Sequence, residues 1–493
     1  MKKASDMAKL VEGAVVVGDG EVLCKSLERD SRKIKEGALF AAIVGANFDG
    51  HDFLDEVRKK GAVAVISEKD FTPPKGMTLI RVPNLTEALN VIAPFFHDYP
   101  ARKMRVIGIT GTNGKTTTSY LIRHILQKNG YKVGLIGTIQ IMIEDEVIKT
   151  SNTTPDVVEL QNILDRMEKS GITHVVMEVS SHALSENRVS GIEFDTAVFT
   201  NLTQDHLDFH KTMENYKRAK AKLFELVSES GEKEKKCAVS NIDDKAGEFM
   251  LNAASCKRLT YGIHNSADIM AINENITHKG TNFTLKGDFG EKPLKLNLTG
   301  EFNVYNALGA ISAGIAEGVA IDKIITALES FDSVPGRFQR VGGNDIAVIV
   351  DYAHTPDGVE NALKTARKIA KNRVIAIFGC GGDRDRTKRP IMGRIAATLA
   401  DIVIATSDNP RTEDPQRILD EVMAGVNEIG ECKDKESILD RKQAIFRGVE
   451  LANDGDVIMI LGKGHENYQI LNTGRIHFDD AEVAREALEE YGK

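Results

Sequence analysis

The chain of 493 residues has little of what marks several protein classes. Its five cysteines are scattered and form no CxxC pair, so neither a zinc site nor a disulfide framework is favoured. Its 12 prolines form no Pro-rich linker. Apolar runs such as residues 38–46 are far shorter than the ~20 residues of a membrane span. Asp6, Lys9 and Glu12 interrupt any signal-peptide core. We therefore expect a reduced, cytoplasmic protein without a membrane span.

An excess of positive charge is also missing. The chain has 64 Lys and Arg against 72 Asp and Glu, a formal net charge of −8. Non-specific nucleic-acid binding needs a basic face, so no nucleic-acid partner is expected. Hydrophobic residues at 42% and charged residues at 28% are typical of a globular protein. At ~100–200 residues per domain, the length suggests about three domains.

One pattern recurs along the chain: an apolar, β-branched run, then a Gly-rich or polar turn, then a helical pattern. Such runs read as buried parallel strands covered by helices, which is an α/β fold. Ligands bind beyond the carboxyl ends of such strands, and the chemically interesting residues of this chain follow the runs. The predicted strands are Met104–Thr110, His174–Val179, Thr196–Leu202, Arg373–Phe378, Asp401–Thr406 and Asp456–Leu461.

Polar, Pro-containing stretches near residues 97–103 and 330–336 suggest two domain boundaries. We expect an N-terminal α/β domain at residues 1–102. A central parallel-sheet domain with the phosphate loop would follow at residues 103–333. A C-terminal, Rossmann-like parallel α/β domain would occupy residues 334–493.

Residues 111–117 (GTNGKTT) join a predicted strand to a predicted helix at Lys115–Lys128. Glycines let backbone N–H groups turn toward an anion, and the helix N-terminus adds a partial positive charge. Lys115 would reach the β- and γ-phosphates, and the Thr116 hydroxyl would bind Mg²⁺. The strict GxxxxGK[ST] pattern is not met, because position 109 is Ile109 rather than glycine. The pattern predicts a nucleotide site without deciding between ATP and GTP.

Three further residues, Glu178, His206 and Lys220, each have an ordinary structural explanation when considered alone. Glu178 ends a predicted strand, where phosphate-loop enzymes often place a metal-facing acid, yet a surface carboxylate is equally consistent. His206 lies in an Asp-His-Leu-Asp segment, and a single histidine is more often structural. Lys220 lies in a basic helical stretch and, taken alone, reads as a solvated lysine.

Six segments in order resemble the Mur ligases, the ATP-dependent amide-forming enzymes that build the peptidoglycan stem peptide. They are GTNGKTT, MEVSSHAL, NLTQDHLDFH, YNALGAISA, SVPGRFQRV and DYAHTPDG. Asp30–Arg32, residues 45–51, Asn152–Pro155 and Asp408–Arg411 resemble the members that add the third residue. The Asp-Asn-Pro-Arg form resembles those that add meso-diaminopimelate rather than lysine. Addition of L-lysine or another diamino acid, a folylpolyglutamate-synthetase-like ligase and a non-catalytic nucleotide switch remain alternatives.

The resemblance implies that the N-terminal domain binds a UDP-linked substrate and that the C-terminal domain binds an amino acid. It also implies a role for each matching residue. ATP would be bound by Gly111, Thr112, Asn113, Gly114, Lys115, Thr116, Thr117, Asn306, Arg337 and Asp351. Thr116 would bind Mg²⁺ at the ATP phosphates, and Glu178, His206 and a carbamylated Lys220 would hold a second Mg²⁺. The UDP-linked substrate would contact Ser31, Ala46, Asn47, Phe48, Asn152, Thr153, Thr154, Ser180, Glu186 and Arg188. The incoming amino acid would contact Arg384, Asp408, Asn409, Pro410, Arg411, Gly462 and Glu466.

The implied chemistry is the making of an amide from a carboxylate and an amine through an acyl phosphate. Lys115, Lys220, His206 and Arg337 are the residues we expect to act in catalysis. The amine must attack as a free base, and His206, His210 and Glu466 all remain open as its proton acceptor. We expect a monomer that takes part in peptidoglycan precursor synthesis, and hence in cell shape and division.

Overall fold

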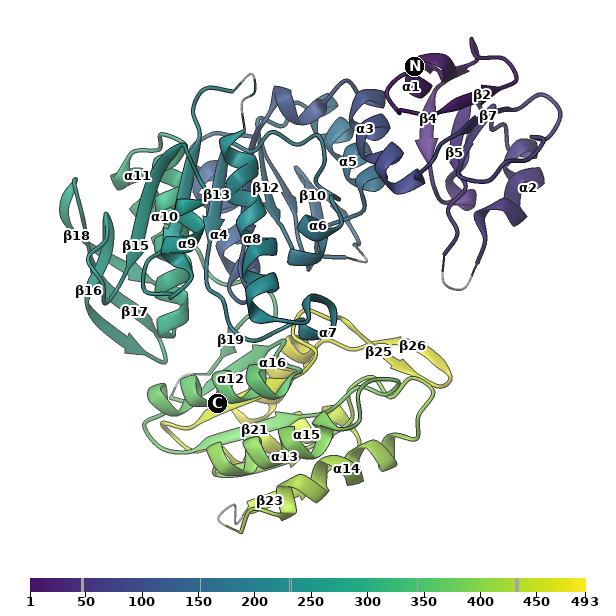
Figure 1. Ribbon diagram of the computed structural model, residues 1–493. Coiled ribbons are helices and arrows are strands. Elements are labelled where there is room, and N and C mark those ends of the chain that lie inside the picture. Colours follow the sequence, from purple (N-terminus) through teal and green to yellow (C-terminus); the bar gives the residue numbers. More distant parts are fainter. Residues whose placement is uncertain (46–47, 151, 230, 232, 344, 431–433) are drawn as a thin grey trace. The chain divides into compact units, whose positions relative to one another are not determined.

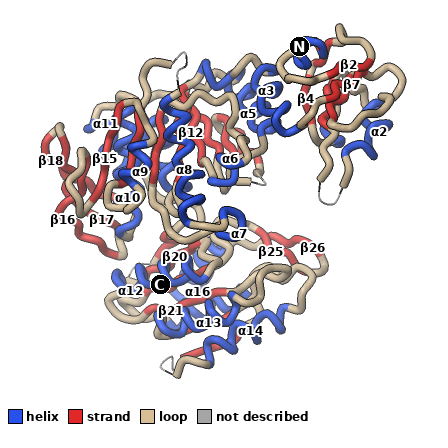
Figure 2. The backbone as a smooth tube through the Cα atoms, viewed as in Figure 1, coloured by secondary structure: helices blue, strands red, loops and turns tan. Residues whose placement is uncertain are grey.

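The computed structural model describes residues 1–493 except 46–47, 151, 230, 232, 344 and 431–433. The described residues form two compact units. Unit 1 contains residues 1–270 and 306–324, and unit 2 contains residues 271–305 and 325–493. Helices and strands alternate through both units (Figures 1 and 2). Within these described ranges, no helix combines the length and the apolar character needed to cross a membrane.

The first hundred residues of unit 1 build a sheet of their own in the order β2-β7-β6-β5-β4. Its strands are β2 (Val15–Val17), β4 (Ser26–Glu28), β5 (Ala38–Ala41), β6 (Ala64–Ser67) and β7 (Thr78–Arg81). Strands β4 to β7 pair in parallel, and β2 pairs antiparallel with β7. A short β1 (Lys2–Lys3) and β3 (Leu23–Cys24) pair beside it. The helices of this region are α1 (Ala4–Ala8), α2 (Leu54–Lys59) and α3 (Leu85–Phe96).

The rest of unit 1 is built on a larger sheet in the order β11-β10-β9-β12-β8-β13-β14-β15-β16. Its strands are β8 (Arg105–Thr110), β9 (Val133–Ile136), β10 (Ile141–Ile143), β11 (Glu146–Ile148), β12 (His174–Glu178), β13 (Thr196–Phe199), β14 (Cys237–Asn241), β15 (Lys257–Gly262) and the start of β16 (Ile269–Thr277). From β9 to β15 the neighbours pair in parallel. The helices are α4 (Lys115–Lys128), α5 (Val157–Lys169), α6 (Ser181–Ser185), α7 (Leu207–His210), α8 (Met213–Ser228), α9 (Gly247–Asn252), most of α10 (Glu301–Ala316) and the start of α11 (Ile321–Glu329).

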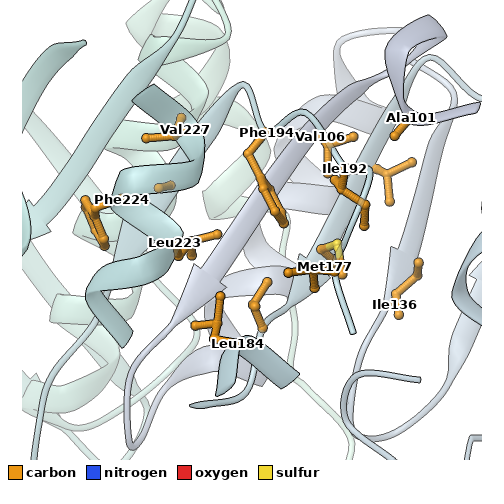
Figure 3. Packing of buried hydrophobic residues seen from close by; sticks show 14 of the residues in the cluster. Ala101, Val106, Ile136, Met177, Leu184, Ile192, Phe194, Leu223, Phe224 and Val227 are labelled. Carbon is orange, nitrogen blue, oxygen red and sulfur yellow. The ribbon is translucent and has the colours of Figure 1, made fainter. Parts of the chain in front are cut away.

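An apolar core joins this sheet to its helices, as Figure 3 shows. Val106 and Met177 from the central strands lie with Phe194, and Leu223 and Phe224 reach the same cluster from helix α8. All of these side chains are buried, and at roughly 25 cal/mol per Å² of apolar area removed from water such a cluster is the main stabilising contribution. The core therefore fixes the β8 and β12 strand ends from which the site residues emerge.

Unit 2 contains a second parallel sheet in the order β19-β20-β24-β21-β22-β23. Its strands are β19 (Gln339–Gly342), β20 (Ala347–Asp351), β21 (Val374–Phe378), β22 (Ile402–Ala405), β23 (Asp434–Ser437) and β24 (Val457–Leu461), and only the β19–β20 pairing among the described strands of this sheet is antiparallel. Helices α12 (Pro356–Ile369), α13 (Lys388–Leu399) and α14 (Pro415–Asn427) pack through one apolar cluster, and α15 (Arg441–Leu451) and α16 (Asp480–Tyr491) pack through another. Two antiparallel hairpins complete it, β17 (Gly280–Gly287) with β18 (Gly290–Leu296) and β25 (Tyr468–Leu471) with β26 (Gly474–His477).

The α/β class with two parallel-sheet regions is confirmed. The six strand predictions correspond to β8, β12, β13, β21, β22 and β24, and the predicted helix at Lys115–Lys128 is α4. The largest difference is at β13, which ends at Phe199 rather than Leu202. Thr200 and Asn201 leave the strand because they bind the neighbouring loop, as described next.

Candidate functional site

The loop of residues 111–117 lies between the end of β8 and the start of α4. Gly111 has φ +152° and Gly114 has φ +86°, a region that favours glycine. A Cβ at Gly111 would lie 1.9 Å from Thr200 Oγ1, and one at Gly114 would lie 2.3 Å from Asn306 Oδ1. Both glycines are therefore required by close approach as well as by backbone conformation. Asn306, from helix α10, is thereby placed directly against the loop.

Thr200 and Asn201, the two residues after β13, hold the same loop through hydrogen bonds. The Thr112 and Asn113 amides donate to the Asn201 backbone and side-chain oxygens at 2.8 and 2.9 Å. The Thr200 hydroxyl donates to the Asn113 carbonyl at 2.6 Å. These contacts fix the backbone of the loop in one conformation. Neither Asn201 nor Thr200 was predicted from the sequence as a site residue, although Asn201 is the first residue of the motif NLTQDHLDFH.

Two lysines turn toward carbonyls of this loop. Lys115 Nζ donates to the carbonyls of Gly111 and Thr112 at 2.9 and 2.8 Å. Lys220 Nζ donates to the Gly111 carbonyl at 2.7 Å and lies over the Tyr216 ring. The Lys220 side chain is fully buried, and burial holds its pKa well below 10.5, with the charge of Lys115 lowering it further. Lys220 is therefore not the solvated lysine that its sequence context alone suggested, because the amine is enclosed and favours its neutral form.

Glu178, at the end of β12, is buried and surrounded by hydroxyl groups. Its Oε2 accepts hydrogen bonds from Thr116 Oγ1 at 3.0 Å and from Thr138 Oγ1 at 2.8 Å, and its Oε1 accepts from the Thr138 amide. Carboxylate and hydroxyl oxygens are the donors Mg²⁺ prefers, and Mg²⁺ commonly takes one or two protein oxygens with phosphates and waters. Thr116 and Glu178 therefore fit such an ion. Among the described residues, no three His, Cys, Asp or Glu side chains form a metal site by themselves.

His206 lies next to these groups in a left-handed backbone conformation, with φ +52°. Its ring packs edge-on against His182 at 4.8 Å and contacts Tyr216 and the Asp205 carboxylate. Burial lowers the pKa of His206, the charge of Asp205 counteracts this, and the charges of His182, Lys115 and Lys220 lower the pKa further. The imidazole is therefore available as a neutral base or metal ligand.

A large cleft of about 1440 Å³ lies within unit 1. Five residues predicted to contact the UDP-linked substrate line it, namely Ser31, Phe48, Asn152, Glu186 and Arg188. Phe48 is more than half exposed, so a flat apolar face is open to a ligand there. Ala46 and Asn47, predicted for the same substrate, lie outside the described residues.

The inner end of the predicted substrate site adjoins Glu178. Thr153 Oγ1 lies 3.1 Å from Thr138 Oγ1, and Thr154 Oγ1 donates to the Glu178 carbonyl at 2.9 Å. The Ser180 amide donates to Thr154 Oγ1, and Arg188 donates to the Thr154 carbonyl at 3.2 Å. A substrate in the cleft could thus extend its acidic end toward the phosphate loop.

In unit 2, Arg337 lies just before β19 and Asp351 is the last residue of β20. The Asp351 carboxylate accepts hydrogen bonds from the Phe338 and Ala353 amides at 2.7 and 2.8 Å. The Arg337 guanidinium lies 4.9 Å from the centre of the Tyr352 ring. Burial raises the pKa of Asp351, and the charge of Arg337 counteracts this. The pair predicted to bind ATP is therefore assembled within one unit.

The residues predicted to bind the amino acid gather beyond β22 and β24. Asn409 Nδ2 donates to Glu466 Oε2 at 2.8 Å, and a Cβ on Gly462 would lie 3.2 Å from Asp408 Oδ2. Arg411, with φ +54°, donates from Nη1 to the Gly382 carbonyl at 2.7 Å. Pro410 is buried in the same turn, and Arg384 is exposed in the loop that carries Gly382. The predicted set is brought together around one turn.

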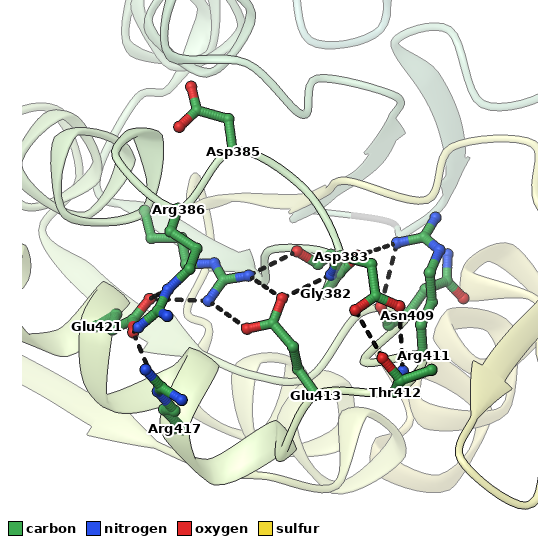
Figure 4. A network of polar contacts seen from close by, with 12 residues as sticks. Gly382, Asp383, Asp385, Arg386, Asn409, Arg411, Thr412, Glu413, Arg417 and Glu421 are labelled. Carbon is green, nitrogen blue, oxygen red and sulfur yellow. Dashed lines mark hydrogen bonds and ion pairs between the residues drawn. The ribbon is translucent and has the colours of Figure 1, made fainter. Parts of the chain in front are cut away.

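A polar network lies beside this turn (Figure 4). Arg389 is fully buried and forms a bidentate pair with Glu413 at 2.8 and 3.0 Å. It also donates to Glu421 at 2.8 Å and to the Gly381 carbonyl at 3.2 Å. Glu413 in turn accepts the Asp383 amide. The network therefore connects helices α13 and α14 to the glycine loop of residues 381–383, whose Gly382 carbonyl accepts the hydrogen bond from Arg411.

Lys463 is a residue of this region that the sequence reasoning missed. It lies in the segment Gly462–Glu466, of which only the first and last residues were selected. The signal was present, because the lysine follows a buried strand between two glycines. In the structure its side chain is fully buried with its ammonium between Asp408, Asn409 and Glu466.

Comparison with known proteins agrees with this geometry. Residues 24–97, 109–314 and 336–464 match the Mur ligase family's catalytic, middle and glutamate ligase domains. A Bacillus cereus protein named UDP-N-acetylmuramoyl-L-alanyl-D-glutamate--2,6-diaminopimelate ligase is 48% identical over 94% of each chain. A solved structure of a UDP-N-acetylmuramoyl-L-alanyl-D-glutamate--2,6-diaminopimelate ligase has a TM-score of 0.70 at 32% identity, covering 100% of this chain and 99% of its own. The MurF ligase of Thermotoga maritima in complex with ADP shares the fold, with a TM-score of 0.63 at 19% identity and coverage of 95% and 98%.

A phosphate loop on one parallel sheet and a carboxylate-rich turn on another are what an ATP-dependent acid–amino-acid ligase requires. The chain belongs to the Mur ligase family.

Proposed function

We propose that this ligase adds meso-2,6-diaminopimelate to UDP-N-acetylmuramoyl-L-alanyl-D-glutamate, with ATP consumed and ADP released, in peptidoglycan precursor synthesis. The observation that carries the proposal is the 48% identity to a relative of that name over 94% of both chains. The turn around Asp408 and Arg411 supports the choice of amino acid. A carboxylate and a guanidinium there match a side chain that ends in an ammonium and a carboxylate.

The reaction has two steps. A carboxylate oxygen of the D-glutamyl residue attacks the γ-phosphorus of ATP, giving an acyl phosphate and ADP. The diaminopimelate amine then attacks the acyl carbon, the C–O bond breaks, and inorganic phosphate leaves while the amine loses a proton. Two anions approach in the first step, so Lys115 and Arg337 are proposed to neutralise the phosphate oxygens. His206, His210 and Glu466 stay open as the proton acceptor.

Thr116 and Glu178 are proposed to hold Mg²⁺, which would supply further neutralisation of phosphate charge when bound. Lys220 is proposed to be carbamylated, with His206 beside it, for a second Mg²⁺. The enclosed Lys220 amine supports this, since its depressed pKa favours the neutral, nucleophilic form that carbamylation needs. The added carboxylate would also replace a positive charge beside Lys115 by a negative one.

The remaining contacts follow the same scheme. Asn306 and Asp351 are proposed to bind the adenosine part of ATP, and the unit 1 cleft is proposed to bind the UDP-linked substrate. We also propose three domains with the boundaries given above. A cytoplasmic monomer is proposed, and size-exclusion chromatography with light scattering tests its monomeric state.

The deciding experiment uses substrate labelled with ¹⁸O in the D-glutamyl carboxylate, with purified enzyme, ATP, Mg²⁺ and diaminopimelate. One labelled oxygen is expected in the released phosphate, because the acyl C–O bond breaks. Phosphate without label would overturn the acyl-phosphate route. Parallel reactions with L-lysine and with a folate substrate test the two alternative ligases, and faster turnover with either would replace the proposed substrate.

A further inference from the structure

The amino-acid turn of unit 2 contains a cation of its own. The Lys463 ammonium lies 3.4 Å from Asp408 Oδ1, 3.2 Å from Asn409 Oδ1 and 3.4 Å from Glu466 Oε2. An ammonium has three N–H donors, and these acceptors account for all of them. The Lys463 side chain is fully buried, whereas the Asp408 and Glu466 side chains remain 9% and 17% exposed.

The acceptors of Lys463 are held in place by other contacts. Asn409 Oδ1 also accepts the Ile470 amide at 2.9 Å, and Gln469 Nε2 donates to the Asp408 carbonyl at 2.6 Å. Strand β25 therefore holds the turn from one side while Lys463 holds it from the other. Removing the ammonium would leave Asp408 and Glu466 as two neighbouring anions that are largely shielded from water.

Four charged groups lie on this turn and on the segment after β24, and Arg384, which is exposed in the neighbouring loop, is not counted with them. Asp408 and Glu466 carry two negative charges, and Lys463 and Arg411 carry two positive charges, so the four groups sum to zero. The buried Arg441 behind them is paired with Asp480 at 2.7 Å and adds no net charge. A neutral pocket suits a side chain that ends in an ammonium and a carboxylate together. A lone ammonium would bring one unbalanced positive charge and leave Arg411 without its carboxylate.

We propose that Lys463 is a specificity-determining positioning residue. Its buried ammonium sets the charge of the amino-acid pocket so that a zwitterionic side-chain end is preferred over a simple amine. This inference rests on the proposed function, since it assumes that Asp408, Arg411 and Glu466 bind the amino acid.

The test compares variants that change the charge of the pocket. The quantity measured for each is the ratio of kcat/KM for diaminopimelate to kcat/KM for L-lysine, obtained from phosphate release. Lys463→Met makes the four-group sum −1, which suits lysine. The ratio is expected to fall by about tenfold or more, as for close charge pairs elsewhere. Lys463→Arg keeps the charge and is expected to keep the ratio. Glu466→Gln makes the sum +1 and is expected to raise the ratio, because lysine then suffers more than diaminopimelate.

Lys442→Met is the matched control, since it removes an exposed ammonium paired with Glu486 elsewhere in unit 2. Its ratio is expected to match that of the unmodified enzyme. An unchanged ratio in folded Lys463→Met would overturn the proposal. If that variant does not fold, Glu466→Gln decides alone, and a ratio that is unchanged or lower would overturn it. Absence of diaminopimelate-dependent turnover in the unmodified enzyme would instead refute the proposed function.

Discussion

Arg389 and Arg386 both form ion pairs with Glu421, but they differ in burial. The Arg389 side chain is 0% exposed and that of Arg386 is 46% exposed. Arg389→Met removes a bidentate pair with Glu413, one contact with Glu421 and one with the Gly381 carbonyl. Arg386→Met removes a contact made largely in water. The two substitutions are alike in chemistry and so isolate the effect of burial.

Breaking a buried ion pair by removing one partner typically costs about 3–5 kcal/mol of unfolding free energy. Glu413 and Glu421 remain 20% and 24% exposed, so water can solvate them in part and the lower end applies. We therefore expect a loss of ~3 kcal/mol for Arg389→Met. For Arg386→Met a loss below about 1 kcal/mol is expected, as for exposed pairs.

Urea unfolding followed by circular dichroism measures both values, and the chain contains no tryptophan to follow by fluorescence. The network also holds the glycine loop to which Arg411 donates, so Arg389→Met is expected to raise the KM for diaminopimelate and leave the KM for ATP unchanged. Equal destabilisation by the two variants, or an unchanged KM for diaminopimelate, would refute the reasoning from burial and from the network.

Three other perturbations test the site. Lys220→Ala is expected to abolish turnover while ATP still binds by calorimetry, and full activity would remove its metal-binding role. Arg411→Ala is expected to raise the KM for diaminopimelate by about tenfold or more, because a bidentate partner of the distal carboxylate is lost; an unchanged KM would exclude that contact. Burial and the charge of Arg337 lower the pKa of His465 from 6.5 to about 4, so folding is opposed as pH falls from 6.5 toward 4. His465→Asn should lessen that acid-side loss by at most ~1.4 kcal/mol per pH unit in urea unfolding at pH 7 and 5, and identical pH profiles would contradict the assignment.

The strands could be predicted because each buried run carries its own signal. β8, β12 and β24 are largely apolar segments followed by glycine or polar residues, and the helix predicted at Lys115–Lys128 has the bounds of α4. Local pattern was sufficient for these elements, because parallel strands buried on both faces need near-continuous apolar sequence.

The missed features depend on contacts between segments distant in sequence. Thr200 and Asn201 directly follow the apolar run of β13, and nothing in the local sequence shows that they bind residues 112–113. Lys463 resembles any lysine in a glycine-rich turn until Asp408, 55 positions earlier, is placed beside it. The roles proposed for Ser31 and Arg188 came from resemblance, and their common cleft is a property of the fold.

The bonds from β13 to residues 112–113 and the crowding at Gly111 and Gly114 have a thermodynamic consequence. A flexible anion-binding loop would lose conformational entropy each time a nucleotide arrived. Here that loss is incurred once, during folding, so the binding energy of each triphosphate is kept for affinity. The phosphate loop is therefore already in one fixed conformation when each new nucleotide binds, at every turnover of the enzyme.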